Sequence, residues 1–140
     1  MPKVHHTAIC TNDVDGSIRF WRDGLGFELS MDAEFDGDWP ALFAAPSRRL
    51  RSIFLGDPHD GSAGILELVD LGPLPPSPAE VEPATGFFLV SVYADVDATL
   101  ARLASLGLGG DPARITVHGV EMAVVRDPNG VRVELIGLPG

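Results

Sequence analysis

One carboxylate near the end of the sequence, Glu134, stands among apolar residues in a run that favours a β-strand. A tight turn precedes it at residues 127–130, because Pro128 presets φ and Gly130 lets the chain leave without steric cost. A lone Glu in such a strand must be exposed, paired with a cation or bound to a metal. Arg132 lies on the same strand face, so an ion pair is available. Exposure, ion pairing and metal binding all remain open for Glu134.

A second lone carboxylate, Glu67, stands between Leu66 and Leu68 in another predicted strand, residues 64–70. A carboxylate in such surroundings needs a partner. An ordinary ion pair is again possible, with an arginine of a neighbouring strand: Arg48, Arg49 or Arg51.

His6 and Cys10 share one face of the first predicted strand, residues 3–11, and alternation places His5 on the opposite face. A lone His on an apolar strand is more often a hydrogen-bonded core residue than a ligand. Cys10 is predicted to be a small buried hydrophobe, because nothing near it in the sequence would lower its pKa. Two other histidines are predicted to lie at the surface: His59 and His118.

The elements that must position these residues occur twice. Asn12-Asp13-Val14-Asp15 matches Ala94-Asp95-Val96-Asp97, and each follows an apolar strand and opens a helix. The last strand of each half carries a single Glu between aliphatic residues, which indicates a duplicated unit. The predicted strands cover residues 3–11, 27–31, 50–55, 64–70, 87–93, 113–118, 120–126 and 131–136, with helices after residue 13 and over 95–106.

The segment 32–40 is an acidic loop that carries two large apolar residues, Phe35 and Trp39. It is either a solvated connection or a segment whose aromatic rings line or cover a pocket. Residues 72–85 are rich in proline, which excludes a central strand or a helix interior and indicates a linker.

The composition limits the classes of protein to which the chain can belong. The chain has 140 residues and a formal charge of −10, so it fits one domain and disfavours nucleic acid and anionic lipid as partners. The sequence has no run of apolar residues long enough for a transmembrane helix, and no targeting segment is visible. A single cysteine excludes an intrachain disulfide and a zinc finger. We therefore predict a cytoplasmic protein.

Three stretches resemble the vicinal oxygen chelate superfamily, which includes glyoxalases, bleomycin-resistance-type proteins, extradiol dioxygenases and methylmalonyl-CoA epimerases. The resemblance rests on residues 4–15, on residues 20–27, and on residues 127–130 running into Val133-Glu134-Leu135. It implies an α+β fold of two βαβββ modules, with mixed sheets curled around a central cleft. The whole chain, residues 1–140, would be one glyoxalase-like domain: module one at 1–71, the proline-rich linker at 72–85 and module two at 86–140.

The resemblance also implies a site. His6, Glu67 and Glu134 match metal-ligand positions of the superfamily, and the two glutamates are the candidate catalytic residues. The fourth position, seven residues before Asp95, is Phe88, which cannot bind a metal. One nitrogen and two carboxylates suit divalent Fe, Mn, Ni, Co or Zn, but the departure at Phe88 leaves a metal-free site equally open. The predicted pocket residues are aromatic: Phe88, Trp39 and Phe35.

Two functions follow from this resemblance. The first is a metal-dependent lyase, isomerase or dioxygenase acting on a small substrate with adjacent oxygens, in which the metal stabilises an enolate or alkoxide. The second is a metal-free protein of the bleomycin-resistance type that sequesters a hydrophobic or aromatic small molecule. Either would form a homodimer, with the two modules pairing within one chain or between chains.

Overall fold

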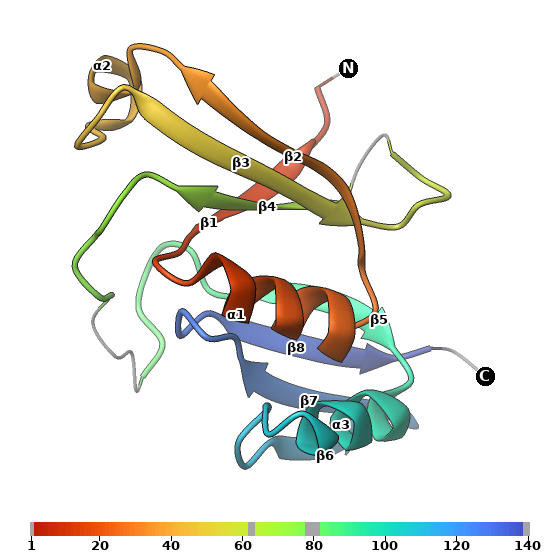
Figure 1. Ribbon diagram of the computed structural model, residues 1–140. Coiled ribbons are helices and arrows are strands. Elements are labelled where there is room, and N and C mark those ends of the chain that lie inside the picture. Colours follow the sequence, from red (N-terminus) through yellow and green to blue (C-terminus); the bar gives the residue numbers. More distant parts are fainter. Residues whose placement is uncertain (1, 62–63, 78–81, 139–140) are drawn as a thin grey trace.

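In a computed structural model the chain forms two four-stranded mixed sheets, described for residues 2–61, 64–77 and 82–138 (Figure 1). The strand orders are β1-β4-β3-β2 and β5-β8-β7-β6, so the second sheet repeats the order of the first. The strands are β1 (His6–Cys10), β2 (Glu28–Asp36), β3 (Arg49–Gly56), β4 (Ile65–Asp70), β5 (Val90–Ala94), β6 (Ala113–Val117), β7 (Val120–Arg126) and β8 (Arg132–Gly137). The helices are α1 (Val14–Ile18), its π-helical continuation η1 (Arg19–Gly24), α2 (Trp39–Phe43) and α3 (Val96–Ser105).

The two sheets have the same mixture of strand directions. β1 runs parallel to β4 and β5 runs parallel to β8, whereas the remaining neighbours are antiparallel. The predicted fold of two βαβββ modules is confirmed. Over the described part of the chain the sheets remain separate, and no strand pairing joins them into one.

The repeated Asp residues cap the two long helical segments. The Asp13 carboxylate accepts a hydrogen bond from the backbone N–H of Gly16, and Asp95 accepts one from that of Ala98. These caps satisfy N–H groups that have no partner within the helix. The matched sequence motifs are therefore matched helix starts.

One hydrophobic core serves both modules. The Phe20 and Trp21 side chains are fully buried, and α1 lies directly beneath the first sheet (Figure 1). The Arg102 guanidinium of α3 donates to the backbone oxygen of Gly24 at 2.8 Å, which ties the second helix to the end of the first. The core strand residues are Ile9, Ile53, Leu55, Leu66, Leu68, Ala123, Val125, Val133 and Leu135.

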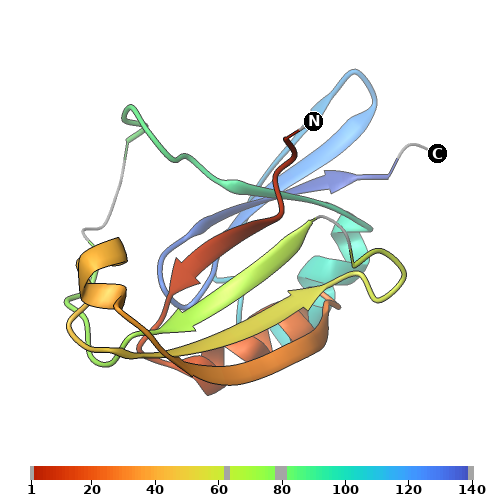
Figure 2. The ribbon, with the colours of Figure 1, turned by 90° about the horizontal axis from the view of Figure 1, so that it is seen from above.

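The face of each sheet that points away from the core is not covered by α1 or α3. Figure 2 shows the first sheet from above. In β8 the residues Val133 and Leu135 are buried, while Arg132, Glu134 and Ile136 are only half-buried, as the alternation predicts. We define the first open face by His6, Ala8, Cys10, Ser52, Phe54 and Glu67, and the second open face by Phe88, Ser91, Tyr93, Ile115, Val117, Arg132 and Glu134.

Several predicted boundaries were wrong. The first strand begins at His6 rather than residue 3, and the strand predicted from Phe87 begins at Val90. The predicted loop 32–40 is instead the end of β2 followed by α2, because Asp38 caps α2 and Pro40 fits its first turn. Among the described residues of the linker, 72–77 and 82–85, none lies in a helix or strand; residues 78–81 are outside the described part.

None of the helices formed by the described residues has both the length and the apolar character that crossing a membrane requires.

Candidate functional site

His6 and Glu67 are brought together by the parallel pairing of β1 with β4. Ala8 lies opposite Glu67 in the register and His6 lies one pleat earlier on the same face. His6 Nε2 is 3.4 Å from Glu67 Oε1, and the side chains are 38% and 15% exposed. The Ser52 hydroxyl, on β3, donates to the other Glu67 oxygen. The carboxylate is therefore held on two sides.

His5 also belongs to this cluster, so the prediction that it faces the other way was wrong. Its Nδ1 is 2.9 Å from Nδ1 of His6, and both rings lie against Phe54, with centroids 6.0 and 5.8 Å away. The cause is the strand boundary: β1 starts at His6, so the alternation of a pleated strand does not govern His5. One Nδ1 donates and the other accepts, which fixes the orientation of the His6 ring.

Glu134 lies on the second open face beside Ser91. The Ser91 hydroxyl donates to Glu134 Oε1 at 2.9 Å, and the two residues are opposite each other in the β5–β8 register. In the first module Ala8 lies opposite Glu67, just as Ser91 lies opposite Glu134 in the second. His6 lies one pleat before Ala8, so its counterpart is Leu89, one pleat before Ser91. Phe88, where the sequence predicts the fourth ligand position, directly precedes this residue, and neither phenylalanine nor leucine can bind a metal.

Neither ion pair that the sequence made available is formed. Arg132 lies over the ring of Phe88, with its Cζ 4.5 Å from the ring centroid, and no salt bridge in the described residues joins it to Glu134. Glu67 pairs with none of the three nearby arginines. These arginines contact acidic residues of β2 instead: Arg48 with Asp36, Arg49 with Glu34 and Arg51 with Asp32.

The three predicted metal ligands do not converge within one chain. Two ligands each about 2.1 Å from an ion can lie as far apart as His6 Nε2 and Glu67 Oε1 do, so this pair fits half of a metal site. Glu134 is not part of that cluster, since no group of three or more His, Cys, Asp or Glu residues that could hold an ion occurs in the described ranges. One chain supplies a half-site of two donors and a separate carboxylate.

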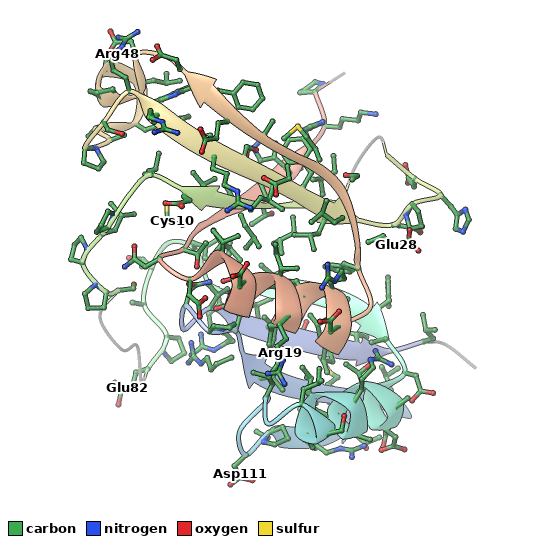
Figure 3. The ribbon with its side chains drawn as sticks, in the orientation of Figure 1. Cys10, Arg19, Glu28, Arg48, Glu82 and Asp111 are labelled. Atoms are coloured by element: carbon green, nitrogen blue, oxygen red, sulfur yellow. The ribbon has the colours of Figure 1, made fainter. Side chains whose placement is uncertain are left out.

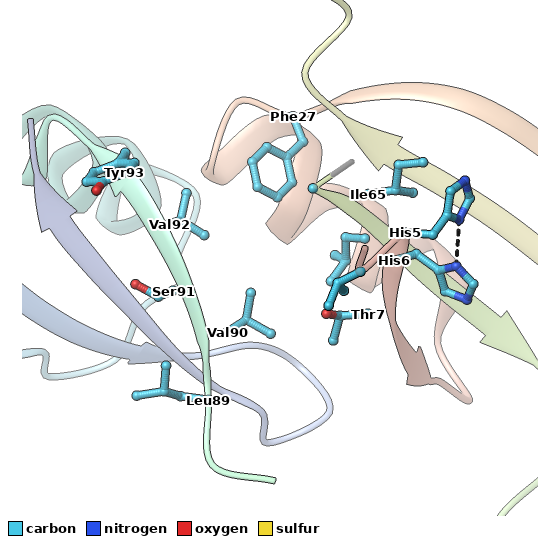
Figure 4. Close-up of a pocket in the computed structure, with 13 residues that line it drawn as sticks. His5, His6, Thr7, Phe27, Ile65, Leu89, Val90, Ser91, Val92 and Tyr93 are labelled. Carbon is cyan, nitrogen blue, oxygen red and sulfur yellow. Dashed lines mark hydrogen bonds between the residues drawn. The ribbon is translucent and has the colours of Figure 1, made fainter. Parts of the chain in front are cut away.

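A pocket of about 420 Å³ lies between the two modules. Figure 4 shows β5 on one side of it and the strands that carry His6 and Ile65 on the other, with Phe27 between them. His6 and Ser91 both line it, so the pocket borders the partners of both carboxylates.

The predicted pocket residues Phe35, Trp39 and Phe88 are not among the residues that line this pocket. Trp39 Nε1 donates to the backbone oxygen of Phe35 at 3.2 Å, and the Trp39 ring stacks on Phe43 with centroids 5.7 Å apart. These rings lie at the α2 end of the first sheet, where Trp39 packs against a small hydrophobic cluster of Ala45, Leu50, Val69 and Leu71. That Phe35, Trp39 and Phe88 contact a ligand stays a prediction.

Cys10 is exposed at the end of β1 (Figure 3), so its predicted burial was wrong. Partial desolvation of the sulfur, together with the negative charge of Glu67, raises the pKa of the Cys10 thiol. A raised pKa keeps the thiol protonated and disfavours a nucleophilic role. His59 and His118 are exposed, as predicted.

Sequence patterns did not reveal Ser52 and Ser91, the two hydroxyl donors to the carboxylates. The places of the two hydroxyl groups beside Glu67 and Glu134 follow from the pairing of β3 with β4 and of β5 with β8, which the sequence alone does not give.

Comparisons with known proteins agree with this architecture. A model of the Glyoxalase/Bleomycin resistance protein/Dioxygenase superfamily matches residues 3–135. The lactoylglutathione lyase-like protein terB of Aspergillus terreus is 36% identical over 148 aligned positions, which cover 97% of this chain and 75% of the relative.

Solved structures resemble the fold at low sequence identity. A glyoxalase family protein of Bacillus cereus is similar with a TM-score of 0.78 and 19% identity, covering 100% of this chain and 96% of the other. Glyoxalase I of Leishmania major has a TM-score of 0.67 and 23% identity, covering 98% and 87%. TnmS3, an antibiotic binding protein of Streptomyces, has a TM-score of 0.64 and 20% identity, covering 99% and 98%. The chain belongs to the glyoxalase/bleomycin resistance protein/dioxygenase superfamily.

Proposed function

We propose that this protein binds a small molecule with two adjacent oxygens at a divalent metal held by His6, Glu67 and Glu134. The observation that carries the proposal is the preorganised pair of His6 and Glu67 on the first open face. His5 holds the His6 ring at Nδ1 and the Ser52 hydroxyl holds Glu67 at Oε2, which leaves His6 Nε2 and Glu67 Oε1 facing each other. Such support is what a ligand pair needs.

A second copy of the chain would supply the missing carboxylate, so we propose a homodimer in which the modules pair between chains. The partner subunit's Glu134 would complete the half-site of His6 and Glu67. The second open face is a suitable surface for this interface, because its apolar side chains are well exposed. The Tyr93 residue is 72% exposed and Ile115 is 61% exposed. Exposed apolar patches of this kind mark interaction sites.

A divalent Fe, Mn, Ni, Co or Zn ion so held would supply Lewis-acid stabilisation of negative charge on the substrate oxygens. The chain itself would orient and deprotonate the substrate. Ser91 holds Glu134 Oε1, so the other carboxylate oxygen, Oε2, is the one available to the metal, and when not bound there it would accept a proton from the substrate. This chemistry is that of a lyase or isomerase, which accords with the name of the Aspergillus relative. A dioxygenase would use the same ligand set.

Cobalt(II) titration of untagged protein tests the metal site, because its absorption spectrum reports the ligands directly. Wild type is expected to bind Co(II), and both His6→Ala and Glu67→Gln are expected to abolish binding. The matched control His59→Ala removes an exposed histidine outside the site and should bind like wild type. A wild-type protein that binds none of the five metals would refute the metal site.

A second candidate function is metal-free sequestration of a hydrophobic or aromatic molecule. Leu89 in the place of a fourth ligand favours it, and the similar fold of an antibiotic binding protein accords with it. In that case ligand-induced thermal stabilisation would persist in EDTA and in His6→Ala. In either case we propose a cytoplasmic protein that binds neither nucleic acid nor membranes, which the formal charge of −10 supports.

A further inference from the structure

Arg132 has a hydrogen-bond donor that nothing in the described chain satisfies. It lies on β8 at the second open face, two residues before Glu134. Its Nη1 atom is buried and has no hydrogen-bond partner among the described residues. A buried, unpaired donor on a charged group carries the full desolvation penalty of that group. Such a group is expected to meet a partner when the site is filled.

The neighbouring carboxylate is not that partner. Glu134 is held by Ser91, and the guanidinium of Arg132 is held over the ring of Phe88 by a cation–π contact. Other arginines of this acidic chain do pair with carboxylates; Arg22, for example, contacts Asp23 at 2.9 Å and Arg114 contacts Asp97 at 2.7 Å. The guanidinium of Arg132 thus carries a positive charge that no salt bridge of the described residues neutralises.

A second arginine adds to that charge. Arg126 lies directly opposite Arg132 in the antiparallel β7–β8 register, and its Nη1 donates to the backbone oxygen of Gly130 at 3.0 Å. Like charges directly opposite each other on a sheet destabilise it. The register thus places two arginine side chains next to each other on neighbouring strands.

We propose that Arg132 binds a carboxylate group of the ligand, with Phe88 contacting the apolar part of the ligand. A planar guanidinium matches a carboxylate through parallel N–H···O bonds, which a lysine ammonium cannot reproduce. The inference rests on the proposed function because it concerns the same ligand, bound beside Glu134 on the second open face. It narrows the substrates and ligands to organic acids, such as aromatic 2-hydroxy or 2-oxo acids.

Mandelate and its neutral amide, mandelamide, are a matched pair of probes. The full-length protein, labelled with ¹⁵N-arginine and kept in EDTA, is titrated with each while the side-chain Nε–H signals are followed by NMR. The Arg132 signal is expected to move saturably with mandelate and to stay in place with mandelamide. This measurement uses wild type alone, so it does not depend on whether a variant folds.

Variants then test the energetic role. Arg132→Met is expected to weaken mandelate binding about tenfold or more, the loss of a hydrogen bond to a charged group, and Arg132→Lys to weaken it less. The control Arg19→Met removes an exposed arginine of η1 (Figure 3) and should leave binding unchanged. Equal responses to both probes, no response of Arg132 to millimolar mandelate, or unchanged affinity in Arg132→Met would each overturn the proposal.

Failure of this proposal and failure of the metal site are separable. Arg132→Met is expected to bind Co(II) like wild type, because Arg132 donates to no candidate metal ligand. If the protein binds Co(II) but the Arg132 NMR signal does not respond to mandelate, only the carboxylate contact is refuted. A protein that binds no metal but shows the mandelate response at Arg132 would refute only the metal site.

Discussion

His5 holds the imidazole ring of His6 at Nδ1, and Glu67 Oε1 lies 3.4 Å from the other ring nitrogen, Nε2. For Nε2 to bind a metal, the Nδ1 atom must carry the proton and donate it to His5. His5 would therefore act as a positioning residue, which selects the tautomer of His6 without contacting the metal. Partners of this kind tune metal affinity as strongly as some ligands do.

His5→Phe is expected to weaken Co(II) binding by about 10–100-fold, because the His6 ring loses the partner that orients it. His5→Asn retains a hydrogen-bonding side chain and should recover part of the affinity. The measurement is a Co(II) titration followed by the visible absorption band, whose position should also shift in His5→Phe. His118→Phe is the control, since His118 is exposed in the β6–β7 turn. Unchanged affinity and spectrum in His5→Phe would assign His5 a purely structural role.

At this scale the sequence predicted His6, Glu67 and Glu134 as candidates but not their partners. The alternation of side chains predicts which residues share a face, but it holds only inside a strand. His5 lies one residue outside β1. The partner of Arg132 depends on where Phe88 lies, which follows no periodic rule because Phe88 precedes β5. Side chains at the ends of elements are the part that patterns do not predict.

Among the elements, the turn between β7 and β8 belongs to the second module and makes a hydrogen bond to the first. Asp127 is buried and accepts hydrogen bonds from the backbone N–H groups of Asn129 and Val131, as its place in the turn predicts. Its other oxygen accepts the indole N–H of Trp21 at 3.2 Å, a contact across 106 residues of sequence. The turn was predictable because it is local, whereas the contact with the first helix required the fold.

Trp21→Phe is expected to destabilise the protein by about 2–4 kcal/mol, through the lost hydrogen bond to a buried carboxylate and the lost volume in the core. Trp39→Phe is the matched control, with an expected loss of about 1 kcal/mol, because Trp39 is only partly buried and donates to a neutral backbone oxygen. Urea unfolding followed by circular dichroism at the helix band gives both values. Equal losses for the two tryptophans would contradict the importance of the contact between modules.

For the whole molecule, two βαβββ modules around one core could be predicted from the duplicated caps and the duplicated carboxylate strands. The arrangement of the modules could not, because it depends on which faces pack together. The first open face and the second open face each carry part of the proposed site, and the described chain does not bring those parts into one cluster. Assembly between copies is therefore the testable consequence at this scale.

Sedimentation equilibrium is expected to show a dimer, and Ile115→Glu together with Val117→Glu is expected to shift it to a monomer. Both residues are exposed on β6 at the second open face, where two carboxylates would be costly to bury in an interface. Ala101→Glu, an exposed change on α3, should remain dimeric. A wild-type monomer that still binds Co(II) with a ligand from Glu134 would rule out pairing of modules between chains.

The strand order also has a consequence for synthesis. Within the described ranges, β1 pairs with β4 alone and β5 with β8 alone, and in each case the partner strand follows dozens of residues later in the sequence. During translation the first strand must stay unpaired until β4 has left the ribosome. β8 then inserts between β5 and β7, both made earlier, so the second sheet cannot be completed before its last-made strand arrives. Pairings that are distant in sequence form slowly, so each carboxylate meets its partners only at the end of its own module's folding.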